Sequence, residues 1–387
     1  MLTSKKNVKK YLKVGKNEKK ENFDELSFLS ILNKSENKQL DIEVLLKKEL
    51  NISEEILFFI KKYINLDSNS SYITATSTNF NINKLQNNTY SSIINFKKIN
   101  DIRYINKFFE SINSKLSKSG LYFGKVETYP NRRKSLLEKY PPIINWIFYI
   151  IDTFFTRVFP KLSITKKLYF YLTKGKGRVI SRAETFGRLY SCGFQIEDEK
   201  SIDNSLYFIA KKIKDPVFDS DPTYGPLISL KRVGLNGKLI NVYKLRTMHP
   251  FSEYLQEYIF NQNKLQKGGK IKNDFRITPE GRLFRKFWID EIPMLFNILK
   301  GDMKIVGVRP LSEHFFSLYD KDLQEKRIKN KPGFIPPYYV DLPKTMTEIM
   351  ESERKYLSLY KKNPIRTDIK YFFLAFKNVL FKGVRSK

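Results

Sequence analysis

The sequence is poor in the residues that build disulfides and soft-metal sites. Its 387 residues include one cysteine, Cys192, and two histidines. A single cysteine cannot form a disulfide within the chain and is typical of a protein from a reducing compartment. Too few cysteine and histidine ligands remain for a zinc site. Any bound metal is therefore expected to be a hard cation with oxygen ligands, such as Mg²⁺.

Long apolar runs are also absent. No stretch of 18 uninterrupted apolar residues occurs, so a conventional membrane-spanning helix is not predicted. The N-terminus is basic and lacks the apolar core that a signal peptide needs. Residues 1–25 are expected to form a solvated basic arm, which is either a disordered tail or a lipid contact.

Acidic residues are strongly outnumbered by basic ones. The chain has 71 Lys and Arg residues against 40 Asp and Glu residues, a formal net charge of +31. Such an excess indicates an anionic partner, which could be nucleic acid, an acidic membrane surface or a phosphorylated substrate. Aromatic residues reach 14% of the chain. Aromatic and basic side chains together suit a membrane interface, and they also suit stacking on nucleobases.

Changes in composition divide the chain into three predicted regions. Residues 1–80 are interpreted as the basic arm and a helical segment, residues 81–215 as an accessory domain, and residues 216–387 as a C-terminal domain. In the first region, two groups of apolar residues have helical spacing: Ile42, Leu45 and Leu46, then Ile56, Phe59, Ile60 and Tyr63. Residues 68–88 are rich in Ser, Asn and Thr and are expected to form loops.

Strands and helices alternate in the accessory region. The predicted order is strand 91–96, helix 102–116, strand 121–126 after a break at Gly120, helix 182–190 ended by Gly193, and strands 194–196 and 206–210. In the first helix, apolar residues fall on one face: Ile102, Ile105, Phe108, Phe109 and Ile112. This alternation is similar to the second half of a Rossmann-like α/β domain. No G-x-G-x-x-G motif follows a strand in the first 200 residues, so the domain is interpreted as a degenerate scaffold without a nucleotide cofactor.

Residues 141–174 form the most apolar part of the chain. Over residues 143–159 the only charged residues are Asp152 and Arg157, and Pro160 follows directly. Seventeen residues are few for a membrane span, so we expect a helix that lies in the membrane interface or enters it and re-emerges at the proline. The alternative is a helix buried between domains.

A β-hairpin is predicted at the start of the C-terminal domain. Asn236 and Gly237 form a preferred two-residue turn between strand-like runs. Val242, Lys244 and Arg246 would share one face, with Lys231 and Arg232 on the opposing strand. These cations could cradle a phosphate group, or the hairpin could be a solvated basic strand pair.

An acidic pair occurs where a helix is expected to begin. Asp290 and Glu291 precede Pro293, a residue tolerated in a first helical turn. The apolar face of this helix would be Ile292, Leu295, Phe296 and Leu299, and Lys300 and Gly301 would end it. The positive end of the helix dipole favours ionised carboxylates. Adjacent residues diverge by about 100° on a helix, so one acid could attack while the other holds a cation. Alone, such a pair is more often a helix cap.

The C-terminal segments resemble the bacterial sugar transferase family, the monotopic polyprenyl-phosphate phosphoglycosyl transferases. The resemblance is carried by GPLISLKRVGLNGK, VYKLRTM, FRITPEGRLFRKFWIDEIPMLFNILKGDMKIVGVRPL and DIKYFFLAFKNVLFKG. The resemblance covers about residues 224–387. The chain as a whole resembles a subgroup of the family that has a long N-terminal extension. The implied fold class is α+β: a mainly helical monotopic transferase domain with a small β-hairpin, preceded by the degenerate Rossmann-like α/β accessory domain.

The resemblance implies a reaction and roles for particular residues. A phosphosugar would pass from a UDP-sugar to polyprenyl (undecaprenyl) phosphate with release of UMP, which initiates a surface glycan. Asp290 would be the nucleophile and Glu291 would bind Mg²⁺. Arg285 would contact phosphate, and Arg309 with Pro310 would hold the nucleotide. With Lys244, Arg246 and Arg232 from the hairpin, these residues complete the predicted substrate site.

The same resemblance implies a location at the cytoplasmic face of the bacterial inner membrane, on an anionic lipid surface, and is compatible with a homo-oligomer. The family's re-entrant membrane helix is missing before Gly225, so residues 141–174 and a C-terminal helix from Asp368 are the predicted membrane contacts. Two further departures are Val308, where the family has proline, and residues 332–337, where it has Pro-Gly-Ile-Thr-Gly. The rival hypotheses are a nucleic-acid-binding protein and an inactive membrane scaffold. Clustering of the motifs around one acidic pair argues against the first, and the intact site residues argue against the second.

Overall fold

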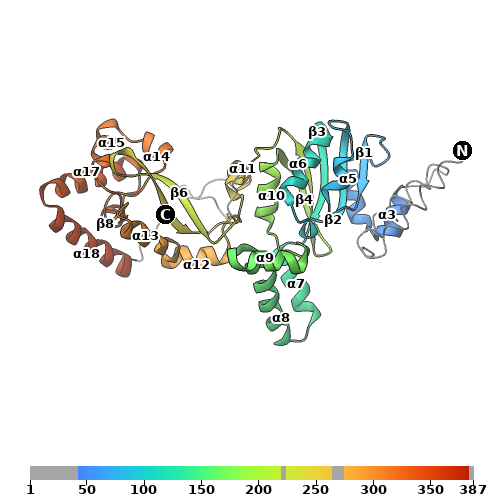
Figure 1. Cartoon of the computed structure of the whole chain (residues 1–387), viewed down its shortest axis with the longest axis horizontal. Helices are drawn as coiled ribbons and strands as arrows, with labels where there is room; N and C mark the ends of the chain where they lie inside the picture. Colours follow the sequence, from blue (N-terminus) through green and yellow to red (C-terminus); the bar gives the residue numbers. More distant parts are fainter. Residues whose placement is uncertain (1–41, 219–223, 264–273, 383–387) are drawn as a thin grey trace, which may run out of the picture. The chain divides into compact units, whose positions relative to one another are not determined.

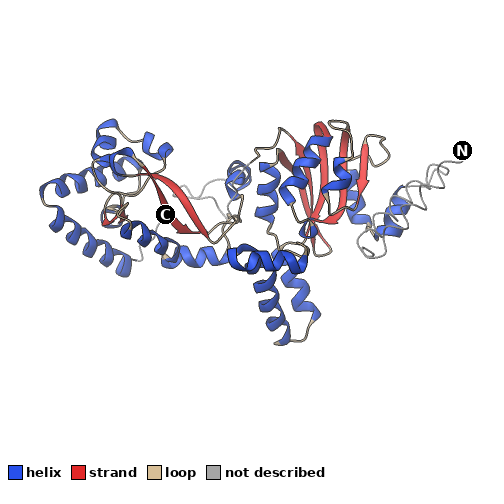
Figure 2. Ribbon diagram, in the orientation of Figure 1, coloured by secondary structure: helices blue, strands red, loops and turns tan. Residues whose placement is uncertain are grey.

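The computed structural model describes residues 42–218, 224–263 and 274–382 and contains two compact units. Unit 1 comprises Met1–Pro222 together with Phe251–Leu255, and unit 2 comprises Thr223–Pro250 and Gln256–Lys387. Helices and strands occur in both units, as an α+β chain requires (Figure 2). The predicted basic arm over residues 1–25 lies outside the described residues.

The described part of unit 1 starts with two helices, α3 (Ile42–Leu50) and α4 (Glu54–Lys61). Both were predicted from the spacing of apolar residues. Ile56, Phe59 and Ile60 of α4 are buried in a core shared with the neighbouring sheet. The apolar spacing of this segment therefore reflects packing on the sheet.

A five-stranded sheet is the centre of unit 1. Its strand order is β1-β2-β3-β5-β4, formed by β1 (Ser71–Thr74), β2 (Tyr90–Lys98), β3 (Leu116–Val126), β4 (Phe194–Ile202) and β5 (Ser205–Lys212). The first three strands are parallel, and β5 runs antiparallel to both of its neighbours. The sheet is therefore mixed, and the assignment of a Rossmann-like origin stays a prediction.

Helices cover this sheet and connect its strands (Figure 1). They are α5 (Asn79–Asn83), the short 3₁₀ turn η1 (Ile99–Asp101), α6 (Ile105–Lys115) and α10 (Arg182–Ser191). Helix α6 begins at Ile105, three residues later than predicted, and the four predicted face residues within it are all buried: Ile105, Phe108, Phe109 and Ile112. Ile102 is also buried but lies before the helix, at the end of η1. Helix α10 and strands β4 and β5 also lie where the sequence predicts them.

Two predictions in this unit are wrong. Residues 68–88 were expected to form loops, yet they contain β1 and α5, because Ile73 and Ile82 are buried and β1 gains a parallel partner in β2. Gly120 was expected to separate a helix from a strand. It lies inside β3, which starts at Leu116, and helix α6 already ends at Lys115. Strand β1 is the edge strand of the five-stranded sheet, so residues 71–74 pack with the accessory region.

A helical hairpin projects from unit 1 (Figure 1). It consists of α7 (Tyr129–Lys139) and α8 (Ile144–Thr153), which is followed by η2 (Phe154–Val158, a π-helical turn), η3 (Phe159–Lys161) and α9 (Ser163–Thr173). Most large apolar side chains of α8 are exposed, so unit 1 does not itself bury this helix. Within the described parts of the chain, no helix combines the length and apolar character needed to cross a membrane.

One short segment from the C-terminal half of the sequence packs in unit 1. It includes the 3₁₀ turn η5 (Ser252–Leu255), and the side chains of Phe251 and Leu255 are buried. The Arg188 guanidinium lies 4.5 Å from the centre of the Phe251 ring. A Cβ atom at Gly187 would stand 2.2 Å from the Phe251 carbonyl oxygen, so only glycine permits this approach of helix α10.

Unit 2 opens with the predicted β-hairpin of β6 (Leu227–Val233) and β7 (Leu239–Leu245). The connection is longer than predicted, because five residues separate the strands. The Gly234 amide bonds to the Lys238 carbonyl at 2.8 Å and closes the loop. Asn236 (φ 57°) and Gly237 (φ 75°) have left-handed conformations, which explains why this pair occurs here.

Helices dominate the rest of unit 2. The elements, in chain order, are α11 (Gln256–Asn263), α12 (Pro279–Phe287), η6 (Ile289–Met294), α13 (Leu295–Leu299), β8 (Lys304–Val306), α14 (Glu313–Ser317), α15 (Lys321–Ile328), β9 (Gly333–Ile335), α16 (Tyr338–Asp341), α17 (Met346–Lys362) and α18 (Pro364–Lys382). The C-terminal helix begins four residues before the predicted Asp368. It is tied to β8 by Lys304, whose ammonium lies 3.1 Å from the Asp368 carboxylate.

The two sequence departures noted above lie at the small sheet of β8 and β9: Val308 follows β8, and residues 332–337 include β9. Val308 is buried, and its carbonyl accepts the Gly333 amide at 2.9 Å. A Cβ atom at Gly333 would stand 2.0 Å from the Gly307 nitrogen, so glycine is required for this close packing. Val308 thus contributes to the core at the position where the family has proline.

Candidate active site

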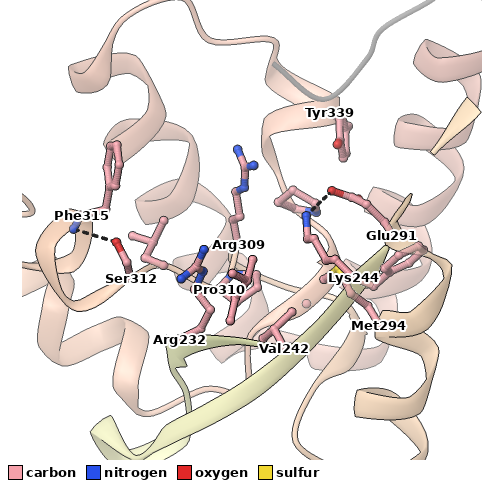
Figure 3. A pocket seen from close by; sticks show the side chains of 15 residues that line it. Arg232, Val242, Lys244, Glu291, Met294, Arg309, Pro310, Ser312, Phe315 and Tyr339 are labelled. Carbon is pink, nitrogen blue, oxygen red and sulfur yellow. Dashed lines mark hydrogen bonds and ion pairs between the residues drawn. The ribbon is translucent and has the colours of Figure 1, made fainter. Parts of the chain in front are cut away.

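A cavity of about 320 Å³ lies in unit 2 between the hairpin, η6 and the loop after β8. Figure 3 shows side chains from all three segments pointing into it. Five of the residues predicted from the sequence line this cavity: Arg232, Lys244, Glu291, Arg309 and Pro310. The structure therefore brings together residues that are up to 78 positions apart in the chain.

The hairpin contributes two of the cavity's cations. Because side chains alternate along a strand, Leu230 and Arg232 of β6 share a face with Val242 and Lys244 of β7. Val242 is buried and anchors this face in a small core with Met294 and Met303. Lys231, which was predicted with this group, does not line the cavity.

Arg309 enters the cavity from a turn held by a buried ion pair. The Arg327 guanidinium donates to the Arg309 carbonyl at 2.5 Å and also pairs with Glu353. Both side chains of this pair are buried. A buried, fully paired guanidinium is a rigid donor, so it fixes the backbone from which Arg309 projects.

Two guanidinium groups influence each other at the cavity. The pKa of Arg232 is lowered, mainly because the group is partly buried and further because Arg309 is close. Two neighbouring cations that are partly removed from water are stabilised by an anion between them. This end of the cavity is therefore suited to a phosphate or diphosphate group.

The acidic pair lies on a sharp turn between two helices. Trp288 ends α12 in a left-handed conformation (φ 59°), and η6 begins at Ile289 as a 3₁₀ helix. This conformation is costly for a bulky residue, and the Trp288 ring packs on Tyr339 with centroids 4.7 Å apart. The helix was predicted to begin near Asp290. It begins one residue earlier, and its first turns are 3₁₀ rather than α.

Glu291 is paired in this structure. Its Oε1 atom lies 2.7 Å from the Lys244 ammonium, and the Glu291 and Lys244 side chains are 9% and 20% exposed. Figure 3 shows this contact at the cavity wall. The hairpin and η6 are thus joined by a mostly buried charge pair.

Asp290 is half-buried, and its surroundings raise the pKa of its carboxyl group. Burial raises its pKa, the neighbouring Glu291 raises it further, and Lys244 and Arg285 oppose the shift. A carboxylate that is incompletely stabilised as an anion is more reactive toward an electrophile than a well-solvated one. Asp290 does not itself line the cavity, although its charged neighbours Lys244 and Glu291 do.

The two remaining predicted arginines lie elsewhere. Arg285 donates to the Thr247 hydroxyl at 2.9 Å, and its pKa is lowered by burial despite the nearby Asp290. It therefore belongs to the surroundings of Asp290 rather than to the cavity lining. Arg246 donates to the Gly225 carbonyl at 2.9 Å and so fixes the start of the hairpin. Its predicted contact with substrate stays a prediction.

The acidic pair fits a magnesium ion. Within the described ranges, no cluster of three or more acidic, histidine or cysteine side chains could form an all-protein metal site. Mg²⁺ typically binds one or two carboxylates and takes its other ligands from water and substrate phosphates. Glu291, beside a cationic cavity, is the carboxylate that would hold Mg²⁺ in this way, and the metal stays a prediction.

The predicted apolar face of the helix after Asp290 points outward. Ile292, Leu295, Phe296 and Leu299 are exposed, and the segment instead packs through Met294, Asn297 and Ile298. Exposed apolar side chains also occur on α12 and α18: Leu283, Phe287, Ile365, Ile369, Phe373, Phe376 and Phe381. The periodicity was detected correctly, but this face does not cover the protein core.

Several site residues could not be recognised from the sequence. Asn297 is fully buried and joins α13 to β7, since its side chain donates to the Asn241 carbonyl at 2.6 Å and accepts the Tyr243 amide at 3.1 Å. Ser312, Phe315 and Tyr339 line the cavity. Asn297 could have been singled out because it is a polar residue in the middle of a predicted apolar helix. The sequence contains no comparable signal for Ser312, Phe315 or Tyr339.

Comparison with known proteins finds relatives of the C-terminal region, which contains these motifs. Residues 218–382 match the family described as bacterial sugar transferase. A galactosyl transferase CpsE from Streptococcus agalactiae is 34% identical over 40% of this chain and 35% of its own length. An undecaprenyl-phosphate galactose phosphotransferase from Salmonella typhimurium is 44% identical over 28% of this chain and 24% of its own length.

A further relative is an uncharacterized sugar transferase EpsL from Bacillus subtilis, which is 40% identical over 33% of this chain and 53% of its own length. The chain thus spans between about a quarter and a half of the length of these relatives. Among solved structures, an S-adenosylmethionine dependent methyltransferase from Mesorhizobium loti aligns with 41% of this chain and 76% of its own. The TM-score is 0.23 and the identity 13%, too low to show a shared fold. The predicted site residues lie within the matched region, and over residues 218–382 this chain is similar to the bacterial sugar transferase family.

Proposed function

We propose that this protein is a phosphoglycosyl transferase that moves a phosphosugar from a UDP-sugar to polyprenyl phosphate. The products are a polyprenyl-diphosphate sugar and UMP. The reaction would initiate a surface glycan at the cytoplasmic face of the bacterial inner membrane. Relatives named as undecaprenyl-phosphate galactose and N-acetylgalactosamine phosphotransferases support this class of substrate.

One observation carries the proposal: a cationic cavity adjoins a two-acid turn. Arg232, Arg309 and Lys244 face the cavity against a single acid, Glu291. This excess of positive charge suits the diphosphate of a nucleotide sugar. Asp290 follows Trp288 on the adjoining turn, where a nucleophile could reach the phosphorus atom bonded to the sugar.

The transfer would occur in two steps at Asp290. A carboxylate oxygen of Asp290 attacks the β-phosphorus of the donor, the bond to the UMP oxygen breaks, and UMP leaves with that electron pair. An oxygen of polyprenyl phosphate then attacks the same phosphorus, and the Asp290 carboxylate is released. Dividing a difficult displacement into two substitutions is the usual advantage of covalent catalysis.

The other charged residues would hold the donor and balance its charge. Glu291 would bind Mg²⁺, which neutralises charge on the diphosphate when present. Arg309 would contact the nucleotide side of the diphosphate from its fixed backbone, and Arg232 would share that anion. Lys244 would exchange Glu291 for a donor phosphate oxygen.

A lipid acceptor is consistent with the surface near Asp290. Ile292, Leu295, Phe296 and Leu299 follow the acidic pair directly and are exposed. An exposed apolar group of this kind marks an interaction site rather than ordinary surface. These side chains could contact the membrane from which a polyprenyl phosphate presents its head group.

The test is release of UMP from a panel of UDP-sugars, begun with UDP-galactose and UDP-N-acetylgalactosamine and run with undecaprenyl phosphate and Mg²⁺. We expect acceptor-dependent UMP formation with at least one donor. Mass spectrometry of enzyme mixed with donor alone should find a phosphosugar on Asp290. An adduct on another residue would contradict the mechanism, and no turnover with any donor would favour the inactive scaffold.

A further inference from the structure

The hairpin of α7 and α8 has its polar side chains between the helices. Asp152 pairs with the Arg132 guanidinium at 2.5 Å, and Tyr149 and Tyr129 bond through their hydroxyls. The Asn145 side chain donates to the Leu137 carbonyl at 3.0 Å. Helix α8 therefore faces α7 with a polar stripe, which is the reverse of a helix packed in a water-soluble hairpin.

The opposite side of α8 is apolar and exposed. It presents Ile144, Trp146, Ile147, Phe148, Ile150, Ile151 and, just beyond the helix, Phe154 and Phe155. Helix α9 adds a second exposed row at helical spacing: Ile164, Leu168, Tyr171 and Leu172. We call these two rows together the α8–α9 surface. Groups of exposed apolar side chains such as these mark an interaction site.

Charge around the α8–α9 surface selects the kind of partner. From Tyr129 to Thr173 the sequence has eight Lys and Arg residues and two acidic residues. Lys166 and Lys167 are exposed beside the apolar row of α9. The Arg133 guanidinium lies 5.3 Å from the centre of the Trp146 ring. Apolar and aromatic groups bordered by cations match a bilayer interface with anionic lipid head groups.

Length limits how deep this surface can lie. Helix α8 has ten residues and continues directly into the five residues of η2. Together they are roughly 20 Å long, whereas the hydrocarbon core of a bilayer is about 30 Å thick. Helix α7 has no buried residues and exposes Arg133, Lys134 and Lys139. The hairpin can thus enter one leaflet at its interface but cannot cross the membrane.

We infer that the α8–α9 surface binds an anionic lipid bilayer and anchors the accessory unit to one leaflet. This inference goes beyond the proposed function and does not depend on it, because every residue involved belongs to unit 1. The unit would therefore contact the membrane independently of the exposed apolar residues near Asp290.

The experiment uses Trp146 as a local probe in the full-length protein. The chain has two tryptophans, so Trp288→Phe leaves Trp146 alone. Fluorescence is recorded with vesicles of phosphatidylcholine and with vesicles that also contain phosphatidylglycerol, each with and without brominated acyl chains. We expect a blue shift and strong quenching by the brominated lipids, with tighter binding to the anionic vesicles.

Two variants in this background test the surface. Replacing Ile147 and Ile151 with serine should abolish the quenching of Trp146, because the apolar contact with the bilayer is lost. Both side chains are exposed, so their removal should leave the fold intact. Replacing Lys166 and Lys167 with glutamine should weaken binding to anionic vesicles roughly thirty-fold at low salt, since each lysine near the surface contributes about fivefold. The matched control is Phe58→Ser, which removes an exposed aromatic residue of the same unit outside this surface.

The readout separates this proposal from a membrane contact of unit 2. If unit 2 alone binds lipid, the protein will sediment with vesicles while Trp146 remains unquenched, which would overturn the inference. A blue shift that depends on protein concentration and needs no lipid would instead show that a second copy covers the surface, and it would also overturn the inference. Loss of UMP release in the same preparation would leave the quenching result unaffected.

Discussion

Lys244→Met should reveal whether Lys244 and a divalent cation compete for Glu291. In this structure the two charges are 2.7 Å apart, and their side chains are 20% and 9% exposed. Removing the lysine leaves a carboxylate with little access to water and with Asp290 beside it. A fully buried pair that loses one partner typically costs about 3–5 kcal/mol, and a hydrogen bond to a charged group contributes about 1.5–3 kcal/mol.

Since this pair keeps some access to solvent, we expect a loss of about 2–3 kcal/mol, which is below the range for a fully buried pair and within the range for one hydrogen bond to a charged group. For a domain the size of unit 2, that corresponds to a fall in Tm of roughly 5–10 °C. Mg²⁺ should recover much of the loss, because a ligand at about a hundred times its Kd stabilises by about 2.7 kcal/mol. The native protein should respond less, since Lys244 already neutralises Glu291.

The assay is thermal unfolding of the full-length protein with and without Mg²⁺, in the absence of donor. Lys231→Met is the matched control, because Lys231 is an exposed lysine of the same hairpin that does not line the cavity. Combining Lys244→Met with Glu291→Gln should restore stability and remove the response to Mg²⁺. If Lys244→Met is as stable as the native protein, or if Mg²⁺ raises the Tm of both proteins equally, the reasoning is wrong.

Three further predictions concern the site and its supports. Asp290→Asn should abolish UMP release while leaving the protein at least as stable at neutral pH, because burial and Glu291 disfavour the charged form; calorimetry and the UMP assay check both parts. Burial alone would raise the pKa of Glu184, but Arg188 holds it at about 2. The Glu184 carboxylate therefore stabilises unit 1 at pH values above its unfolded pKa. Glu184→Gln should lower the free energy of unfolding by roughly 3 kcal/mol at pH 7. Denaturant titrations should show this difference shrinking as the pH falls from about 4.5 toward 2. Arg327→Met should lower the Tm, and combining it with Glu353→Leu should recover the Tm. The KM for the UDP-sugar should stay raised in both variants, because the Arg309 carbonyl no longer accepts a hydrogen bond from Arg327.

Local patterns in the sequence predicted much of the fold. Apolar spacing identified the buried face of α6, and Asn236 with Gly237 located the turn of the hairpin. The acidic pair was found because its neighbours form a specific family pattern. These features depend on residues close together in the chain, where periodicity and turn chemistry act directly.

Features that depend on distant residues were not predictable. Strand β1 is only four residues long and is stabilised by its partner β2, so its polar composition indicated a loop. Likewise, nothing local to Arg309 shows that Arg327 and Glu353 hold its backbone. Periodicity also located the apolar face around Ile292 without telling what covers it. A spacing pattern defines a face, whereas its environment is set by tertiary structure and solvent.

The segment Phe251–Leu255 bears on how this protein could have evolved by recombination of domains. The chain crosses between its two units three times, at residues 222, 250 and 255, rather than once. A gene fusion that simply joined an accessory module to a transferase would leave a single junction. A fragment starting at Thr223 would carry the apolar side chains of Phe251 and Leu255 without the helix that buries them. The two units are therefore expected to be inherited together, with Gly187 and Phe251 changing in concert.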